Sequence, residues 1–220
     1  MSAVPAPLEP ALEVFDAGAF QATVGASARQ MADLQAFREL LIEWNGRMNL
    51  VGPSALGEFW RRHALDSAQL RNLAPEARTW ADLGAGAGFP GLVLAILAKD
   101  QPGAHVHLVE SVAKRCRFLQ TVVEALSLPA TVHNARAEDL SVNVDVVTAR
   151  ACAPLVRLLG YAWPYLRIGA TGLFLKGQDV ASELQAAAIY WKFDADLIPS
   201  ISYSEGRIVQ LKRVSRVRPV

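Results

Sequence analysis

Apolar side chains recur at helical spacing through the first part of the chain. Between residues 26 and 44 the apolar positions that define one helix face are Met31, Leu34, Phe37, Leu40, Leu41 and Trp44. Asn45-Gly46 then supplies a helix stop, and a second helical stretch covers about 55–70. No strand pattern precedes residue 76. We therefore expect a flexible N-terminal segment over 1–25, which starts rich in proline and alanine, and a helical cap over 26–75.

From residue 79 short apolar strands alternate with amphipathic helices. The expected strands are 79–83, 106–109, 131–133, 144–147 and 172–175. The expected helices are an apolar one after the first strand, 114–126, 155–166 with an interruption at Pro164, and 182–190. This alternation is typical of βαβ units in a mostly parallel sheet. We expect a Rossmann-like α/β domain over 76–220.

The end of the chain departs from this alternation. Two strands, 193–198 and 207–213, follow one another with a turn at Ser204-Glu205-Gly206 and no helix between them. Consecutive strands joined by a short turn pair in antiparallel fashion. The sequence therefore predicts a seven-stranded, mostly parallel sheet with a terminal antiparallel hairpin at its edge.

Composition limits the class of protein. Apolar residues make up 52% of the chain and charged residues 20%, as in ordinary globular proteins. With a net charge of +1, any nucleic-acid binding must come from local basic patches. Two cysteines, Cys116 and Cys152, are too few for a disulfide framework or a structural zinc site. The start lacks a secretory signal and the longest apolar run is far below the roughly 20 residues of a membrane span. We expect a cytoplasmic monomer without metal or membrane contact.

A glycine-rich segment between the first strand and the following helix is the strongest chemical signal. It reads Asp82-Leu83-Gly84-Ala85-Gly86-Ala87-Gly88-Phe89-Pro90-Gly91. Glycines at this place let the backbone turn sharply and approach a ligand closely. Glu110 ends the next strand, where its carboxylate can accept hydrogen bonds from both hydroxyls of a ribose. After the third strand, Ala137 and Glu138 can meet an adenine edge through a backbone amide and a carboxylate.

Two cofactor classes share this layout. The dinucleotide pattern is G-x-G-x-x-G, whereas here Gly84, Gly86 and Gly88 alternate and Phe89 stands where the last glycine would fall. An acid two residues before the first glycine, followed by G-x-G-x-G, is the pattern of S-adenosylmethionine methyltransferases. Two alternatives remain open: an NAD-dependent oxidoreductase, and a non-catalytic RNA-binding module with a degenerate cofactor pocket.

In its motifs the chain resembles the bacterial 16S rRNA guanine-N7 methyltransferases, also called the glucose-inhibited division protein B family. The matching segments lie in order over about 30–210: Trp44-Asn45, Met48-Asn49-Leu50, Arg62-His63, Leu65-Asp66-Ser67, Gly86-Ala87-Gly88-Phe89-Pro90-Gly91, Glu110-Ser111, Lys114-Arg115, Arg117-Phe118-Leu119, Arg136-Ala137-Glu138, Arg150-Ala151 and Leu175-Lys176-Gly177. The Phe-Pro-Gly ending of the loop and the Arg-His/Asp-Ser segment are specific to the family. Ala149 departs from its usual serine, and Glu110 from its frequent aspartate.

The resemblance implies a class I methyltransferase that transfers the methyl group of S-adenosylmethionine to N7 of guanine 527 in 16S rRNA, free or within a 30S particle. The expected cofactor contacts are Asp82, Gly84, Gly86, Gly88, Phe89, Glu110, Ala137, Glu138 and Arg150, with Arg150 and Lys176 as catalytic residues. The expected RNA contacts are Arg47, Arg61, Arg62, His63, Lys176, Lys212 and Arg213. For His63 the alternative is a core histidine that pairs with Asp66.

The chemistry of guanine N7 agrees with what the sequence lacks. N7 carries an in-plane lone pair and no proton, so the enzyme needs alignment rather than a general base. Because N7 faces the deep groove of A-form RNA, the target must lie in a loop or be extruded. Cytosine-C5 and amino-nitrogen methyltransferases carry motifs after the fourth strand that the segment 148–154 does not match. Cys152 in that segment is interpreted as a small buried residue.

Overall fold

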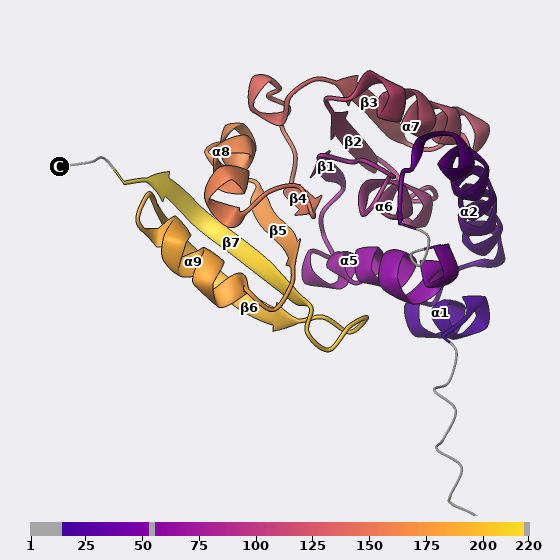
Figure 1. Ribbon diagram of the computed structural model, residues 1–220, viewed down its shortest axis with the longest axis horizontal. Helices are drawn as coiled ribbons and strands as arrows, with labels where there is room; N and C mark the ends of the chain where they lie inside the picture. Colours follow the sequence, from indigo (N-terminus) through magenta and orange to yellow (C-terminus); the bar gives the residue numbers. More distant parts are fainter. Residues whose placement is uncertain (1–14, 53–55, 218–220) are drawn as a thin grey trace, which may run out of the picture.

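A seven-stranded sheet forms the centre of the protein (Figure 1). The computed structural model describes residues 15–52 and 56–217. The strands are β1 Thr79–Leu83, β2 His105–Glu110, β3 Ala130–Asn134, β4 Val146–Arg150, β5 Thr171–Lys176, β6 Trp191–Pro199 and β7 Arg207–Arg216. Their order is β3-β2-β1-β4-β5-β7-β6, with β1 to β5 parallel and β7 antiparallel to both of its neighbours. The expected α/β architecture and terminal hairpin are confirmed.

Helices cover both faces of the sheet. They are α1 Ala17–Val24, α2 Ala28–Met48, the π-helix η1 Phe59–Leu65, α4 Asp66–Ala68, α5 Leu70–Leu73, α6 Gly91–Leu97, α7 Ala113–Ala125, the 3-10 helix η2 Ala137–Asp139, α8 Leu155–Leu166 and α9 Val180–Ala188. One core lies between the sheet and α2, α6 and α7, and a second between the sheet and α8 and α9. None of the helices in the described ranges combines the length and apolarity needed to cross a bilayer.

The helical cap is fastened to the sheet domain by aromatic packing. α2 begins with a capping box in which Ser27 and Gln30 satisfy each other's backbone amides. Phe37 on its inner face is fully buried, with ring centroids 5.3 Å from Phe89 and 6.5 Å from Phe118. The face predicted as core packing is therefore core, and it contacts the glycine loop directly through Phe89.

The N-terminal region differs from the sequence prediction in two places. Part of the segment expected to be flexible forms α1, because Phe20 buries its ring fully against Trp60 at 5.5 Å; residues 1–14 lie outside the described ranges. α2 also continues through the predicted stop at Asn45-Gly46. The Asn45 side chain accepts a hydrogen bond from Val51 N, and Asn49, at φ 47°, ends the helix instead.

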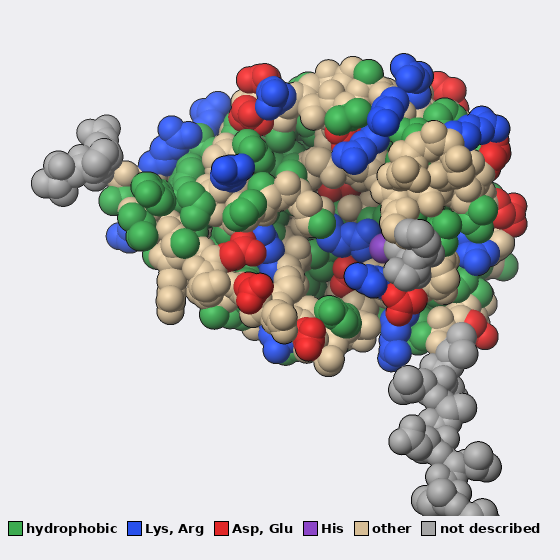
Figure 2. Space-filling model, viewed as in Figure 1, with side chains coloured by type: hydrophobic (Ala, Val, Ile, Leu, Met, Phe, Trp, Pro, Cys, Tyr) green, Lys and Arg blue, Asp and Glu red, His purple; other side chains and the backbone are tan. Residues whose placement is uncertain are grey.

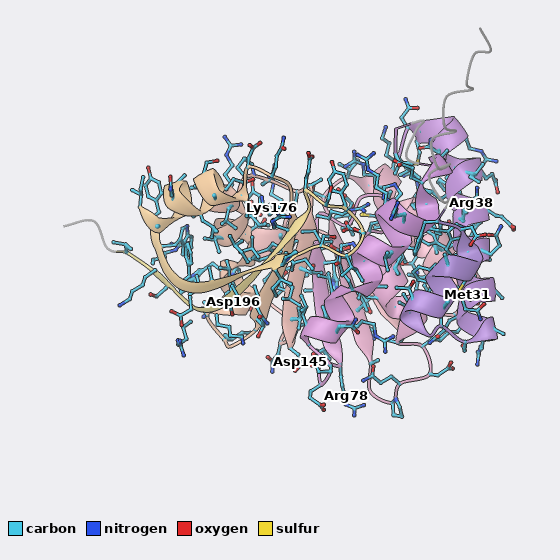
Figure 3. The ribbon with its side chains drawn as sticks, turned by 90° about the horizontal axis from the view of Figure 1, so that it is seen from below. Met31, Arg38, Arg78, Asp145, Lys176 and Asp196 are labelled. Atoms are coloured by element: carbon cyan, nitrogen blue, oxygen red, sulfur yellow. The ribbon has the colours of Figure 1, made fainter. Side chains whose placement is uncertain are left out.

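α8 and β4 differ from the prediction, besides small shifts in the ends of other elements. α8 is not interrupted at Pro164, which lies two residues before the helix end. β4 covers Val146–Arg150 rather than 144–147, and Asp145 is engaged just before the strand starts. Its Oδ2 accepts hydrogen bonds from the backbone N of Arg78 and Thr79. Figure 3 shows Asp145 and Arg78 near one end of the parallel strands and Lys176 near the other end.

Candidate active site

In the glycine loop after β1, some glycines are tightly packed and others have free space beside their Cα atoms. Gly84, Gly86 and Gly88 have φ values of 69°, 54° and 90°, in the left-handed region that favours glycine. The N–H groups of Gly84 and Ala85 both donate to Val109 O, at 2.8 and 3.0 Å, and tie the loop to β2. A Cβ at Gly88 would collide with Leu92, whereas one at Gly86 would have 3.6 Å to its nearest neighbour. The backbone at Gly86 therefore leaves room for a ligand.

Glu110 places a fixed carboxylate beside that loop. It ends β2, is 4% exposed, and accepts hydrogen bonds from Gly86 N at 3.0 Å and Val112 N at 2.8 Å through different oxygens. Arg115 lies 3.8 Å from Oε2. These contacts hold the charge at the carboxyl end of the sheet.

Asp82 lies in the core beside the glycine loop. Its side chain is fully buried, and Oδ2 accepts a hydrogen bond of 2.8 Å from Gly91 N at the start of α6. Oδ1 has no partner among the described residues. Burial raises the pKa of this carboxyl to about 7. Asp82 thus holds the loop against α6.

A cavity of about 270 Å³ opens at the carboxyl ends of β1 to β4. We call it the cofactor cavity. Of the residues predicted to contact the cofactor, those that line it are Gly84, Glu110, Ala137 and Glu138. The others, which do not line it, are Asp82, Gly86, Gly88, Phe89 and Arg150. Cys152 also lines the cavity, half-buried rather than buried as predicted; burial raises the pKa of its thiol.

A second cavity of about 710 Å³ lies beside the first, at the ends of β4 and β5 and the start of β7. We call it the acceptor cavity. Ala151 and Cys152 line both cavities and form a shared wall. Charged residues from distant parts of the chain line it, namely Arg62, Asp66, Arg150, Lys176, Glu183 and Arg207.

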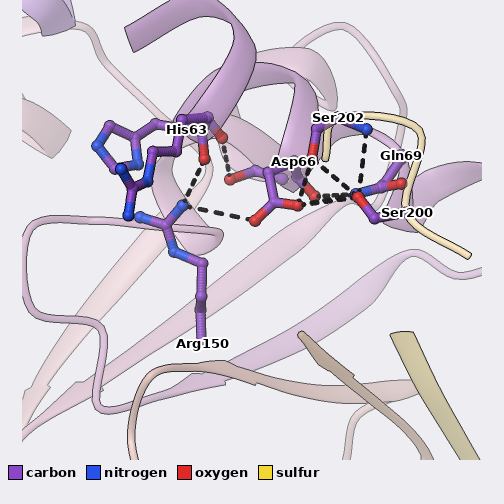
Figure 4. A network of polar contacts seen from close by, with 8 residues as sticks. His63, Asp66, Gln69, Arg150, Ser200 and Ser202 are labelled. Carbon is purple, nitrogen blue, oxygen red and sulfur yellow. Dashed lines mark hydrogen bonds and ion pairs between the residues drawn. The ribbon is translucent and has the colours of Figure 1, made fainter. Parts of the chain in front are cut away.

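Arg150 is held by a network in one wall of the acceptor cavity (Figure 4). Its Nη1 donates to the backbone oxygen of Arg62 at 3.0 Å and lies 3.6 Å from Asp66 Oδ2. Asp66 Oδ1 accepts hydrogen bonds from Ser202 Oγ at 2.7 Å and Gln69 Nε2 at 3.0 Å. Burial lowers the pKa of the Arg150 guanidinium, and Asp66 opposes that effect. The network joins β4, the helical cap and the β6–β7 loop.

His63 is buried, as the interpretation of a core histidine expects, but it does not pair with Asp66. Its ring is 6% exposed and stacks on Phe89 with centroids 4.6 Å apart. Neither ring nitrogen has a hydrogen-bond partner in the described part of the chain, so the expected pair with Asp66 is absent there. Burial and the neighbouring Arg150 lower its pKa to about 3, which leaves the imidazole neutral at pH 7. His63 lines the acceptor cavity as an uncharged ring.

Lys176 lies in the acceptor cavity, as its position at the end of β5 predicts. Its side chain is 9% exposed, and Nζ donates to Ala153 O and to Glu183 Oε2, both at 2.7 Å. Glu183 Oε2 also accepts a hydrogen bond from Leu155 N. The sequence does not single out Glu183. The chain enters α9 just after the carboxyl end of β5, so a residue in the first turn of α9 can lie close to Lys176.

Three arginines predicted to contact RNA come from the helical cap, and they differ in whether they line a cavity. Arg61 and Arg62 line a hollow of about 480 Å³ beside the acceptor cavity, and Arg62 lines both. Arg47 pairs with Glu43 at the end of α2 and lines none of these cavities.

Lys212 and Arg213, also predicted to contact RNA, lie toward the other end of β7, away from the acceptor cavity. The register of β5 with β7 places Lys176 opposite Arg207 and Gly172 opposite Leu211, so β7 runs away from the acceptor cavity. Arg213 forms an ion pair with Asp194. Arg207 reaches the cavity instead, since an antiparallel last strand begins where its parallel neighbour ends.

Cations and carboxylates alternate around the hollowed face of the molecule (Figure 2). No wide surface of one sign is seen in this view, in agreement with the net charge of +1. Within the described ranges, no group of three His, Cys, Asp or Glu side chains is arranged to hold a metal ion.

Relatives cover nearly the whole chain. A family model described as rRNA small subunit methyltransferase G matches residues 30–207. The ribosomal RNA small subunit methyltransferase G of Caulobacter vibrioides is 63% identical over 205 residues, which cover 93% of this chain and 95% of the relative. That of Methylorubrum extorquens is 47% identical and covers 88% and 93%, respectively.

Solved structures share the fold at low sequence identity. A putative O-methyltransferase from Klebsiella pneumoniae superposes with a TM-score of 0.55 at 11% identity, over 88% of this chain and 93% of the other. A SAM dependent methyltransferase from Aquifex aeolicus gives 0.52 at 14% identity, over 79% and 98%. The Rossmann-like architecture is common to all three proteins.

Proposed function

Because the chain belongs to the rRNA small subunit methyltransferase G family, we propose that it transfers the methyl group of S-adenosylmethionine to N7 of one guanine in 16S rRNA. The observation that carries this proposal is the pair of cavities that meet at Ala151 and Cys152. One has the loop and carboxylates that suit an adenosyl group, and the other has room for a purine. A methyl group at the shared wall would lie between them.

The residues of the cofactor cavity suit S-adenosylmethionine. Gly84 lines the cavity and packs against Cys152, while an added Cβ at Gly86 would have only Gly84 O within 4 Å, so a ligand could approach the backbone there closely. Glu110 and Glu138 line the cavity, where they would accept hydrogen bonds from the ribose hydroxyls and from the adenine edge. The bound cofactor supplies an electrophilic methyl group on a sulfonium.

The residues of the acceptor cavity suit alignment rather than proton transfer. Guanine N7 attacks through a lone pair without losing a proton, so no general base is required. His63 is neutral, the raised pKa of Cys152 keeps its thiol protonated, and Arg150 is engaged with Asp66. Methyl transfer would leave positive charge on the purine, and the carboxylates of Asp66 and Glu183 line the cavity that would hold it.

RNA must bring the base into this cavity from outside. A guanine in a loop, or one extruded from its stack, exposes N7 as the reaction requires. Arg61 and Arg62 line the neighbouring hollow, where they would contact phosphates of the RNA. We propose that the enzyme acts as a cytoplasmic monomer, on rRNA that is free or in a 30S particle, because both cavities are complete within one chain.

The alternatives from the sequence lack support. Family membership argues against an NAD-dependent oxidoreductase and against a non-catalytic module. Phe89, where a dinucleotide-binding loop has glycine, is 3% exposed and packs beneath Arg150.

The proposal is tested on ribosomal particles from cells that lack the gene. Purified protein is incubated with these 30S particles, or their 16S rRNA, and S-adenosylmethionine labelled in its methyl group. We expect one label per rRNA, recovered as 7-methylguanosine on nuclease digestion. Label on another atom or base, or in none, would refute the proposal.

A further inference from the structure

Resting on the proposed function, we infer that Lys176 and Glu183 together read the Watson–Crick edge of the acceptor guanine. This pair would select guanine over adenine. Both residues line the acceptor cavity, and their charged groups are 2.7 Å apart. Lys176 comes from the end of β5 and Glu183 from the first turns of α9.

Each residue has hydrogen-bonding capacity to spare. The Lys176 ammonium has three N–H groups, of which two are used by Ala153 O and Glu183 Oε2. Glu183 Oε2 accepts from Lys176 and from Leu155 N, while Oε1 has no hydrogen-bond partner within the described ranges. The Glu183 side chain is 26% exposed and lines the acceptor cavity. The pair therefore offers one donor beside one acceptor.

This donor–acceptor order matches guanine. Along its Watson–Crick edge guanine presents the acceptor O6, then the donors N1–H and N2–H. Lys176 can donate to O6 while Glu183 accepts from N1–H and N2–H. Adenine presents the opposite order, a donor at N6 and an acceptor at N1, which would face the ammonium and the carboxylate with like polarity. Extruded bases are commonly read on this edge.

The same orientation directs N7 toward the cofactor. In a purine, N7 lies on the five-membered ring, away from N1 and N2. β4 lies next to β5, with Arg150 opposite Leu175, and Ala151 and Cys152 follow β4. A base whose Watson–Crick edge rests on Lys176 and Glu183 therefore turns its five-membered ring toward the wall shared with the cofactor cavity.

Asp66, the other carboxylate of the acceptor cavity, has partners at both oxygens. Its Oδ1 accepts from Gln69, Ser200 and Ser202, and Oδ2 forms an ion pair with Arg150 (Figure 4). These contacts hold the β6–β7 loop against the helical cap. Glu183 differs in that its Oε1 has neither a hydrogen bond nor an ion pair among the described residues, and Asp66 provides a matched comparison.

The test compares guanine with inosine, which lacks only the N2 amino group, at the target position of reconstituted 30S particles. We expect the wild-type protein to lose roughly 10-fold or more in kcat/KM with inosine, because the hydrogen bond from N2 is lost while the contacts of O6 and N1–H remain. Glu183→Gln keeps an oxygen for Leu155 and Lys176 but turns an N–H₂ toward the base. In this variant we expect guanine methylation to fall by a similar factor and the guanine-to-inosine ratio to approach 1.

Two controls separate base reading from a structural role. Asp66→Asn should lower methylation of guanine and inosine by the same factor, and Glu183→Gln should retain wild-type affinity for S-adenosylmethionine. Equal losses on both bases in Glu183→Gln, or a wild-type protein that treats guanine and inosine alike, would overturn the inference. Failure of the wild-type protein to methylate any guanine would refute the proposed function itself.

Discussion

The guanidinium of Arg150 lies over the ring of Phe89, with 4.8 Å between Cζ and the ring centroid. His63 stacks on the same ring, and Phe37 packs against it from the helical cap. One aromatic ring in the glycine loop therefore positions the cation that ends β4. This contact connects the loop near the cofactor cavity to the wall of the acceptor cavity.

Replacing Arg150 should impair the enzyme without unfolding it. We expect Arg150→Ala to lower kcat/KM by about 10-fold or more, because the guanidinium positions Asp66, the backbone of Arg62 and the cavity wall at once. Arg150→Lys should recover only part, since an ammonium lacks the planar fork and the stack on Phe89. Initial rates on 30S particles measure both, with Arg29→Ala in an exposed pair with Asp100 as control. A wild-type rate in Arg150→Ala would remove this residue from the site.

A side chain at Gly86 should block the cofactor. Gly86→Val places a branched group in space where only Gly84 O comes within 4 Å, so we expect calorimetry to detect no binding of S-adenosylmethionine. The positive φ of 54° also strains any non-glycine residue. Gly103→Val controls for that strain, because Gly103 has φ 76° and lies before β2, at the edge away from the cavities. Normal affinity in Gly86→Val would contradict the assignment of this loop.

Asp82 should make stability fall as pH rises. Its pKa is 3.8 in the unfolded chain and about 7 when buried, so its contribution is fully present below about pH 4 and is lost as pH rises through about 7. Between these values the slope is about 1.4 kcal/mol per pH unit for one proton. Asp82→Asn keeps an acceptor for Gly91 N and should remove the slope.

Urea unfolding of wild type and Asp82→Asn at pH 5 and pH 8 measures this effect as a difference. The difference is needed because the lowered pKa of His63 acts in the opposite sense, removing stability as pH falls from 6.5 toward about 3. Parallel curves for the two proteins would show that Asp82 does not titrate in this range.

Arg62 and Arg213 should differ as RNA contacts. Arg62→Ala removes a cation between the acceptor cavity and the adjoining hollow, so we expect KM for 30S particles to rise several-fold and the dependence of KM on salt to weaken. Arg213→Ala, toward the other end of β7, should leave both unchanged. Similar effects of the two substitutions would place RNA across the whole hairpin instead.

Local pattern was enough to predict the elements that carry the chemistry. β1 and α8 begin and end where the apolar periodicity places them, and the glycine loop and Glu110 meet because parallel strands end at one edge. The start of β4 could not be predicted in this way. Just before it, Asp145 accepts hydrogen bonds from the backbone N–H groups of Arg78 and Thr79, partners more than sixty residues away.

The acceptor cavity was harder to predict from the sequence, because it too depends on contacts between residues far apart in the chain. Asp66 contacts Ser202, 136 residues later, and no spacing rule connects them. Arg207 could have been found, because a predicted antiparallel hairpin must return its last strand to the edge where β5 ends. Lys212 and Arg213 drew attention by charge alone, which carries no information about the edge of the sheet on which they lie.

The hydrogen bond from Ser202 to Asp66 also shows how differently the two cavities draw on the chain. Every residue that lines the cofactor cavity lies between Gly84 and Tyr161. The residues that line the acceptor cavity extend from Arg62 to Arg207. A chain cut before β6 would keep every residue that lines the first cavity and would lose one wall of the second.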